Sequence, residues 1–312
     1  MKIVIPGGTG HRGAAVAKYW RESGHEVIIA TRKPNGPNEV LWDGVGLGPW
    51  ALELDGADIV FNLAGRTVNC RYTPENLQQM MDSRVLSTRA VAMAIQQAKN
   101  PPKLWLQMST ATIYAHRFDA ANDEATGIIG GNEPDAPPKW VASINIAKAW
   151  EAELEKAQVP GTRKVAVRAS MVMGPEKDGV FQTLAKLARR GLAGRAGDGK
   201  QYISWIHEDD FHRALDFIID HPDMDGAINV ASPNPIPNKE FNQILRETLG
   251  VKIGLPAAEW MLELGARAMR TETELILKSR RVVPGRLLAE GFTFRLPHWD
   301  EACKHLAEAS NP

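Results

Sequence analysis

Short apolar runs rich in β-branched residues alternate with longer amphipathic stretches over the first half of the chain. This alternation is typical of βαβ units around a parallel sheet. It predicts strands at residues 2–5, 26–31, 40–42, 58–63, 104–108 and 165–171, and helices at 13–23, 74–97 and 140–157. Thr73 and Pro74 are suited to the cap and first turn of the second helix. We therefore expect an α/β fold with a Rossmann-type, doubly wound parallel sheet.

The alternation weakens after Gly174 and Pro175, where helical patterns at 181–190, 238–249 and 257–269 dominate. We expect a smaller, mainly helical C-terminal domain that binds substrate or acts as a lid. Residues 1–172 with about 205–232 are assigned to the Rossmann domain, and 173–204 with 233–312 to the second. The stretch 119–139 is rich in Gly, Pro, Asn and Asp, which predicts a long loop that is either functional or disordered.

Composition excludes several classes of protein. The 312 residues carry 37 basic and 37 acidic side chains, so the zero net charge argues against nucleic acid as a partner. Cys70 and Cys303 are far apart and form no CxxC pair, which fits a reducing compartment and argues against structural zinc. No apolar run approaches the ~20 residues of a membrane-spanning helix. We expect a cytoplasmic protein without a membrane partner.

Glycines recur at positions 7, 10 and 13, directly after the first predicted strand and before a helix. Gly7 would permit a tight turn, Gly10 would let the backbone approach a pyrophosphate, and Gly13 would let the helix pack on the sheet. The GxxGxxG spacing has one more residue between the first two glycines than the GxGxxG fingerprint. An ordinary glycine-rich turn is the alternative to this dinucleotide site.

The second predicted strand ends in Ala30-Thr31-Arg32-Lys33, without the carboxylate that binds the 2′-hydroxyl of NAD. Two adjacent bases would instead attract a 2′-phosphate through charge-assisted bonds worth roughly 1.5–3 kcal/mol. The sequence therefore predicts NADP(H) as the cofactor. Arg12 could reinforce this preference, although Arg12 and Arg32 could also be solvated surface charges.

Motifs along almost the whole chain resemble the atypical extended short-chain dehydrogenases/reductases. More narrowly, they resemble the NAD(P)-dependent epimerase-like subfamily, which is sometimes mislabelled as cell-division inhibitors. The motifs are 7–13, Asn62-Leu63-Ala64-Gly65, Asp82-Ser83-Arg84-Val85, 109–114, Arg168 with Gly174-Pro175, Ser204-Trp205-Ile206-His207 with Asp209-Asp210, and the tail from Asn238 through Arg281-Val282-Val283-Pro284 to Phe292.

The resemblance implies that residues 63–65 line the cofactor, that Asp43 lies near the adenine and that Arg84 faces the cofactor. Ser170 and Met171 would approach the nicotinamide. His11 and Arg12 depart from the family, which usually has two apolar residues there. The cofactor-binding residues that we predict are Gly7, Thr9, Gly10, His11, Arg12, Gly13, Thr31, Arg32, Asp43, Leu63, Ala64, Gly65, Arg84, Met108, Ser109, Lys148, Ser170 and Met171.

Extended reductases usually combine a Ser or Thr after the 104–108 strand with a Tyr and, four residues later, a Lys. Thr110 fits the first role, with a strand-end turn as the alternative. The second pair is missing, because none of the four tyrosines is followed by that lysine: the residues four places after Tyr19, Tyr72, Tyr114 and Tyr202 are Ser23, Asn76, Phe118 and Ile206. In the 140–157 helix the pair positions hold Ser143 and Ala147 if Glu151 fixes the register, or Ile144 and Lys148 if the lysine does.

Tyr114, Tyr202 or water could donate the proton instead, although each tyrosine could be packing at a domain boundary. Lys148 could reach a ribose hydroxyl. His207 could contact substrate or be a satisfied strand-end histidine. We predict no metal site, because His207 and His212 have no evident third ligand, and Asp209 and Asp210 are better suited to capping a helix at 211–219.

The leading hypothesis is an NADP(H)-dependent oxidoreductase that acts on a small carbonyl or hydroxyl substrate, with Thr110 polarising the oxygen. Because the Tyr-Lys pair is missing, a non-catalytic NADP(H)-binding sensor is the first alternative. A nucleotide-sugar epimerase or dehydratase is the second. The sequence does not identify the substrate, the direction of hydride transfer or the oligomeric state.

Overall fold

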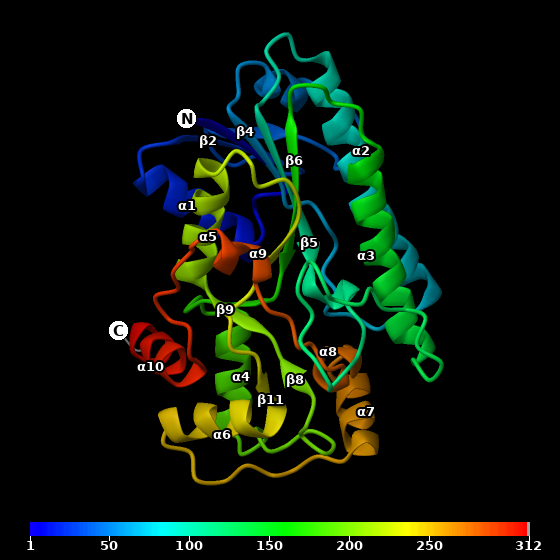
Figure 1. Ribbon diagram of the computed structural model, residues 1–312, viewed down its shortest axis with the longest axis vertical. Coiled ribbons are helices and arrows are strands. Elements are labelled where there is room, and N and C mark those ends of the chain that lie inside the picture. The colour runs from blue at the N-terminus through cyan, green and yellow to red at the C-terminus, as the bar shows by residue number, and fades with distance from the viewer. Residues whose placement is uncertain (311–312) are drawn as a thin grey trace.

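Seven parallel strands form the central sheet of the computed structural model, which describes residues 1–310 (Figure 1). The strand order is β10-β6-β5-β4-β1-β2-β3. The strands are β1 (Lys2–Pro6), β2 (Glu26–Thr31), β3 (Glu39–Leu41), β4 (Ile59–Asn62), β5 (Leu104–Thr110), β6 (Arg163–Ala169) and β10 (Gly226–Val230). The order 3-2-1-4-5-6 of the first six strands is that of a Rossmann fold, so the predicted fold class is confirmed.

Helices cover both faces of the sheet (Figure 1). On one face, α1 (His11–Glu22) and α5 (Glu208–Asp220) are joined through Asp216, which accepts hydrogen bonds from Tyr19 Oη at 2.6 Å and Trp20 Nε1 at 2.8 Å. The other face is covered by α2 (Pro74–Gln97) and α3 (Pro138–Lys156), with the short 3-10 helix η1 (Pro49–Leu54). Each layer buries its apolar stripe against the sheet, as periodic patterning requires.

A mainly helical part with its own core lies beyond the carboxyl edge of the sheet (Figure 1). Its core includes Phe181, Trp205, Phe241 and Trp299. This confirms the predicted helical C-terminal region. Its elements are α4 (Val180–Arg189), β8 (Tyr202–Ile203), β11 (Ile236–Pro237), α6 (Asn238–Thr248), α7 (Glu259–Ala268), α8 (Glu274–Leu277) and α10 (Trp299–Ala309).

The helix α9 (Gly285–Ala289) returns to the central sheet, and Leu287 and Phe292 are buried in the same core as β1 and α5. The C-terminal 233–312 segment thus contributes to both cores. The domain boundaries given above remain a prediction.

The structure differs from the predicted elements at two places near the carboxyl edge. The strand expected at 165–171 divides, because β6 ends at Ala169 and β7 (Met171–Met173) pairs with β9 (Trp205–His207) in a separate two-stranded sheet. The helix expected at 211–219 begins earlier, at Glu208. Its cap is His207, whose Nδ1 accepts from the Asp209 amide, so Asp209 and Asp210 are first-turn residues and not the cap.

The long loop is held by the C-terminal tail. Asn122 pairs with Val282 in a parallel bridge, and the Asn122 amide donates to Arg281 O at 2.6 Å. Long-range hydrogen bonds therefore tie the loop to the C-terminal tail, in addition to local turn bonds such as those that Asp123 Oδ1 accepts from the amides of Ala125 and Thr126.

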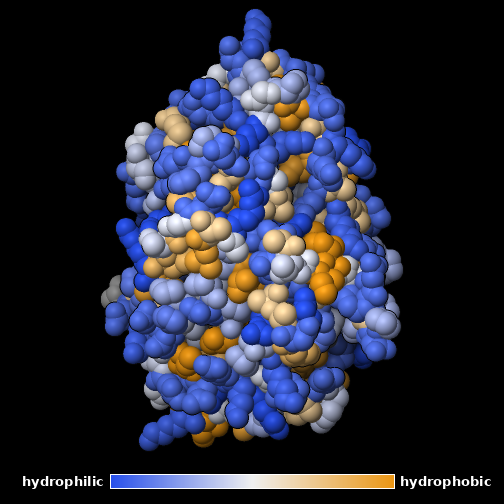
Figure 2. All heavy atoms as spheres, viewed as in Figure 1, coloured by the Kyte–Doolittle hydropathy of each residue, from blue (hydrophilic) through white to orange (hydrophobic). Residues whose placement is uncertain are grey.

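The surface viewed in Figure 2 is mainly hydrophilic, with apolar side chains in small separate groups. No helix within residues 1–310 is long and apolar enough to cross a bilayer.

Candidate functional site

The strand order reverses between β1 and β4, and the loops after these two strands meet at the carboxyl edge of the sheet. Gly7 has φ +77°, and its amide donates to Ala30 O at 2.9 Å. A Cβ on Gly7 would lie 2.6 Å from Ala64 Cα, so only glycine fits there. Open α/β sheets bind ligands at such a switch point.

The rest of the glycine loop leaves room for a ligand. A Cβ on Gly13 would lie 2.5 Å from Gly8 O, so Gly13 lets α1 approach the loop itself. Gly10, by contrast, faces open space: its Cβ would meet no atom within 4 Å. No side chain caps α1 and no acidic residue lies in its first turn, so its amides and dipole can serve an anion. This cradle fits a pyrophosphate.

The end of β2 carries uncompensated positive charge. Arg32 and Lys33 are exposed, and Thr31 Oγ1 lies 3.3 Å from Thr9 Oγ1, which joins the two loops. Asp43 is exposed, and its carboxylate accepts from the amides of Val45 and Gly46 at 2.8 Å each. These bonds lower the pKa of Asp43.

Arg12, which we predicted to reinforce binding of a 2′-phosphate, contacts other parts of the protein. Its Nη2 donates to Val172 O at 2.8 Å, and the guanidinium lies 5.8 Å from the Phe211 ring centroid. The side chain is therefore held by β7 and α5, which is at odds with a contact to a 2′-phosphate. His11 is exposed, while Gly13, Val16, Ala17 and Trp20 bury the inner face of α1.

The β4 loop is shaped by Asn62, whose Oδ1 accepts from the Ala64 amide at 3.0 Å. Beyond it, Gly65 lies against Arg84 of α2, and the Arg84 guanidinium lies 4.9 Å from the Trp150 ring centroid. Burial lowers the pKa of Arg84 to about 10, so this residue is a cation at neutral pH. The structure thus brings Leu63–Gly65 and Arg84 together.

A chain of polar side chains crosses the ends of β5, β6 and β10. Glu151 accepts from Ser109 Oγ and forms a bidentate pair with Arg168, with Nη2–Oε2 at 2.7 Å. Arg168 also donates to Tyr114 Oη at 2.8 Å, and Tyr114 donates to Asn229 Oδ1 at 2.9 Å. Tyr114 is 2% exposed, so its hydroxyl is committed to this buried network, which favours a structural role over proton donation.

Thr110 ends β5, and its Oγ1 accepts from the Thr112 amide at 3.1 Å, which caps the 3-10 helix η2 (Ala111–Ile113). A hydroxyl that accepts in this way can still donate its own proton. The strand-end role and the predicted role are therefore compatible. Thr110 pairs with Ala169, the residue before Ser170, and Ser170 Oγ donates to Val230 O at 3.3 Å. Met108 packs against the main core.

On α3, Ser143 faces the C-terminal segment and donates to Glu274 Oε1 at 2.8 Å. Glu274 is 1% exposed and also binds Arg280 Nη2 at 3.1 Å and Tyr72 Oη at 3.1 Å. Neither Ser143 with Ala147 nor Ile144 with Lys148 supplies a tyrosine and a lysine on α3. Lys148 Nζ instead lies close to Gly131 of the long loop, and its predicted role at the ribose stays a prediction.

The buried cluster of Glu274, Arg280 and Tyr72 was not among the predicted site residues. Glu274 lies 131 residues from Ser143 and 202 from Tyr72, and no local pattern announces such contacts.

Three more predicted site residues make contacts within the protein. Tyr202 belongs to β8, and its ring packs 4.5 Å from the Arg281 guanidinium. His207 is 1% exposed: Nδ1 accepts from the Asp209 amide, and Nε2 lies 3.0 Å from His305 Nδ1. Because both ring nitrogens have partners inside the protein, these contacts favour the alternative of a satisfied strand-end histidine, and the substrate contact expected of His207 stays a prediction. Met171 packs against the core of the helical C-terminal part.

His305 brings a third donor beside His207 and Asp209, which the sequence did not indicate. The three ligand atoms lie within 4.8 Å of one another. However, both His207 nitrogens already have hydrogen-bonding partners.

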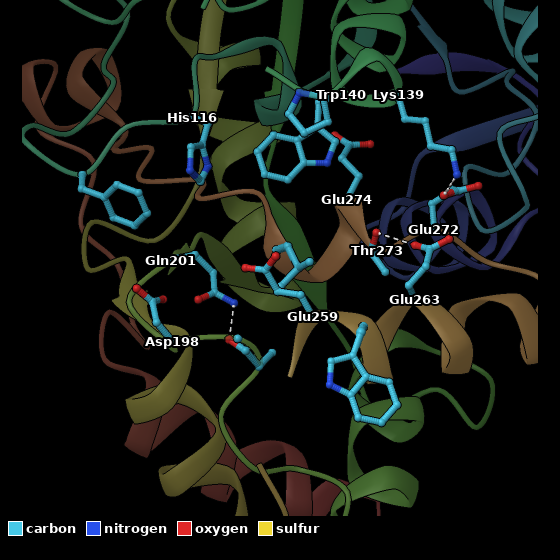
Figure 3. Close-up of a pocket in the computed structure, with 16 residues that line it drawn as sticks. His116, Lys139, Trp140, Asp198, Gln201, Glu259, Glu263, Glu272, Thr273 and Glu274 are labelled. Atoms are coloured by element: carbon cyan, nitrogen blue, oxygen red, sulfur yellow. Dashed lines mark hydrogen bonds and ion pairs between the residues drawn. The ribbon is translucent and has the colours of Figure 1, made fainter. Parts of the chain in front are cut away.

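A cavity of about 620 Å³ opens between the start of α3 and the helices α7 and α8 (Figure 3). Its walls carry aromatic rings and carboxylates. The lining residues include His116, Phe118, Lys139, Trp140, Asp198, Gln201, Glu259, Trp260, Glu263, Glu272, Thr273, Glu274 and Leu277. Arg280 links the cavity to η2. Its Nη2 donates to Glu274 Oε1 and its Nε donates to Thr112 Oγ1, each at 3.1 Å. The size is that of a small-molecule site.

Comparison with known proteins gives two family matches. Residues 3–231 match the NAD dependent epimerase/dehydratase family, and residues 257–306 match a domain of unknown function, DUF1731.

Whole-length relatives agree with these matches. The epimerase family protein SDR39U1 of Homo sapiens is 31% identical over 98% of this chain and 99% of its own, and YfhF of Bacillus subtilis is 30% identical over 94% of both. The crystal structure of human SDR39U1 (isoform 2) with NADPH has a TM-score of 0.83 at 29% identity and covers 99% of both chains. A nucleoside-diphosphate sugar epimerase from Corynebacterium glutamicum has a TM-score of 0.76 at 25% identity, covering 98% of this chain and 57% of its own.

Proposed function

This chain belongs to the NAD dependent epimerase/dehydratase family, and we propose that it is an NADP(H)-dependent oxidoreductase acting on a small carbonyl or hydroxyl compound. One observation carries the proposal: a glycine loop without a capping side chain is joined through Thr9 and Thr31 to the end of β2, where two bases are exposed. The NADPH in the crystal structure of the human relative supports the choice of cofactor.

The residues that would hold the cofactor follow from the cradle. The α1 amides beyond Gly10 would bind the pyrophosphate, and Arg32 would bind the 2′-phosphate. Leu63–Gly65 and Arg84 would lie along the nicotinamide half. When bound, the nicotinamide supplies or accepts a hydride.

The chain's own chemistry centres on Thr110. Its oxygen accepts from the Thr112 amide, so its proton is directed elsewhere and can bind a substrate oxygen. Such a bond stabilises the negative charge that develops on the oxygen of a reduced carbonyl. Because Tyr114 is committed to Arg168 and Asn229, we assign the proton itself to water.

The activity is tested with NADPH and a panel of aldehydes and ketones, following absorbance at 340 nm. Thr110→Ala should lower turnover by roughly 10–100-fold without changing the NADPH dissociation constant, because one transition-state hydrogen bond is lost. Thr110→Ser should recover most of the rate. Equal turnover in Thr110→Ala and the parent would reject this role.

A second candidate is a sensor that holds NADP(H) without turnover. The missing Tyr-Lys pair favours it. Tight NADPH binding with no oxidation across the whole panel would support the sensor over the enzyme.

The cofactor preference has its own test. Arg32→Ala should reduce the NADPH-to-NADH affinity ratio by roughly tenfold or more, because a charge-assisted contact to the 2′-phosphate is lost. Lys103→Ala, an exposed lysine at the opposite edge of the sheet, is the matched control. Isothermal titration of both cofactors measures the ratio, and an unchanged ratio in Arg32→Ala contradicts the assignment.

A further inference from the structure

The cavity beside α3 combines aromatic walls with an excess of negative charge. Lys139 is the one Lys or Arg among its lining residues, against five carboxylates from Asp198, Glu259, Glu263, Glu272 and Glu274. Burial lowers the pKa of His116, so its ring adds no charge at pH 7. The side chains that line the cavity therefore carry a net negative formal charge.

The buried carboxylates belong to the wall. Glu272 is 1% exposed and binds Lys139 Nζ at 2.8 Å, Arg71 Nε at 3.2 Å and the Tyr72 amide at 2.8 Å. Figure 3 shows the Lys139 ammonium turned onto Glu272. Lys139 is thus already engaged and does not offer a free cation to a ligand.

The carboxylates nearer the mouth are not balanced in the same way. Asp198 and Glu259 are exposed, and neither forms an ion pair in the part of the chain that the structure describes. They come from different segments, the 196–201 turn and α7, and both line the same cavity. A ligand inside would meet their field from two sides.

Aromatic rings form another part of the wall. Trp140 lies 4.9 Å from His116, centroid to centroid, and Trp260 is 67% exposed on α7. Indole faces attract organic cations as well as flat apolar rings, and the attraction is larger where water is excluded.

We propose that this cavity takes a flat organic carbonyl compound bearing a positive charge, and that it rejects nucleoside diphosphate sugars. The lining residues offer a pyrophosphate no arginine and no free lysine, and the exposed carboxylates would repel its negative charge. A cation would gain from Asp198, Glu259 and the two indoles together. This inference rests on the proposed function, since it names the substrate class of that site.

The test uses probes that differ in charge at one position. Titrations of the NADPH-saturated protein with 4-formyl-N,N,N-trimethylanilinium, with 4-formylbenzenesulfonate and with UDP-glucose are followed by tryptophan fluorescence and by calorimetry. We expect the cation to bind at least tenfold more tightly than the sulfonate, and UDP-glucose to bind more weakly than the cation.

Variants link the preference to the cavity. Asp198→Asn combined with Glu259→Gln should bring the cation-to-sulfonate ratio close to one, and both side chains are exposed enough for the fold to tolerate the change. Glu301→Gln, an exposed carboxylate on α10 outside the cavity, should leave the ratio unchanged. Tighter binding of the sulfonate or UDP-glucose, binding of none of the three probes, or a ratio that survives the double substitution would each overturn the proposal.

Failure of the proposed function is distinguishable from this result. If the protein does not bind NADPH in a separate titration, the oxidoreductase proposal fails, while the probe preference is measured on the same protein without cofactor.

Discussion

The glycine loop after β1 and the cavity wall around Glu274 handle polar groups in opposite ways. In the glycine loop, Gly10 faces open space and the first amides of α1 have no capping side chain. In the cavity wall, both oxygens of Glu274 are engaged by Ser143, Arg280 and Tyr72. The first region keeps its hydrogen-bonding capacity for a ligand, whereas the second has used it to join distant segments.

This difference separates two kinds of evidence for function. Unsatisfied backbone donors at a tight turn indicate what the molecule can bind, because their partners are missing from the chain. A fully paired buried carboxylate shows which distant segments of the chain are joined. The ligand then has to be inferred from the exposed side chains of the cavity. The predictions below test this contrast.

The largest expected effect is on stability, in the cavity wall. Glu274→Ala leaves the Arg280 guanidinium without its carboxylate and removes the acceptor of Tyr72 and Ser143, which should lower the free energy of unfolding by about 3–5 kcal/mol. Chemical denaturation measures it, and Glu301→Ala on α10 is the exposed control. A loss below about 1 kcal/mol would mean that the wall is not held by this carboxylate.

Next in size is a pH effect near the start of α5. Burial, and then the neighbouring Glu176, raise the pKa of Glu208 to about 8, and a Cβ on Gly174 would collide with both carboxylates. Between the unfolded pKa of about 4.5 and about 8, only the folded state holds this proton, so stability falls as pH rises through this window.

Glu208→Gln should remove this pH-dependent contribution. Between pH 4.5 and pH 8.5, the free energy of unfolding of the parent should fall by roughly 2–4 kcal/mol more than that of the variant. Denaturation at both pH values gives the difference. Glu75→Gln, an exposed first-turn carboxylate of α2, should show no such change. Parallel pH profiles for Glu208→Gln and the parent would contradict the raised pKa of Glu208.

The smallest stability effect belongs to the glycine loop. Gly7→Ala forces a side chain into φ +77° against Ala64 and should cost about 1–3 kcal/mol. Gly10→Ala has room for its methyl group, so it should leave the melting temperature unchanged and weaken NADPH binding at least tenfold. If Gly10→Ala bound NADPH as the parent does, the cofactor would not lie on this loop.

The sequence by itself determined the elements and the cofactor cradle, because both depend on short stretches of chain. Apolar periodicity placed the strands from β1 to β6, α2, α4, α6 and α7, and α2 runs from Pro74 to Gln97 as predicted, whereas α8, α9 and α10 were not predicted. Glycine positions and the missing acid after β2 carried the cofactor prediction, since backbone conformation and local charge can be read from neighbours in sequence.

Only the tertiary structure decided which polar side chains are committed. It turned Arg12 onto Val172, made His207 a helix cap, enclosed Tyr114 between Arg168 and Asn229, and brought Glu274 to Ser143 from 131 residues away. Each of these side chains has enough rotamer freedom to face several partners, and its choice is fixed by segments that come together only when the two cores close. The residues next to them in the sequence do not predict such contacts. A strand or a glycine turn, by contrast, is specified by residues within a few positions of itself.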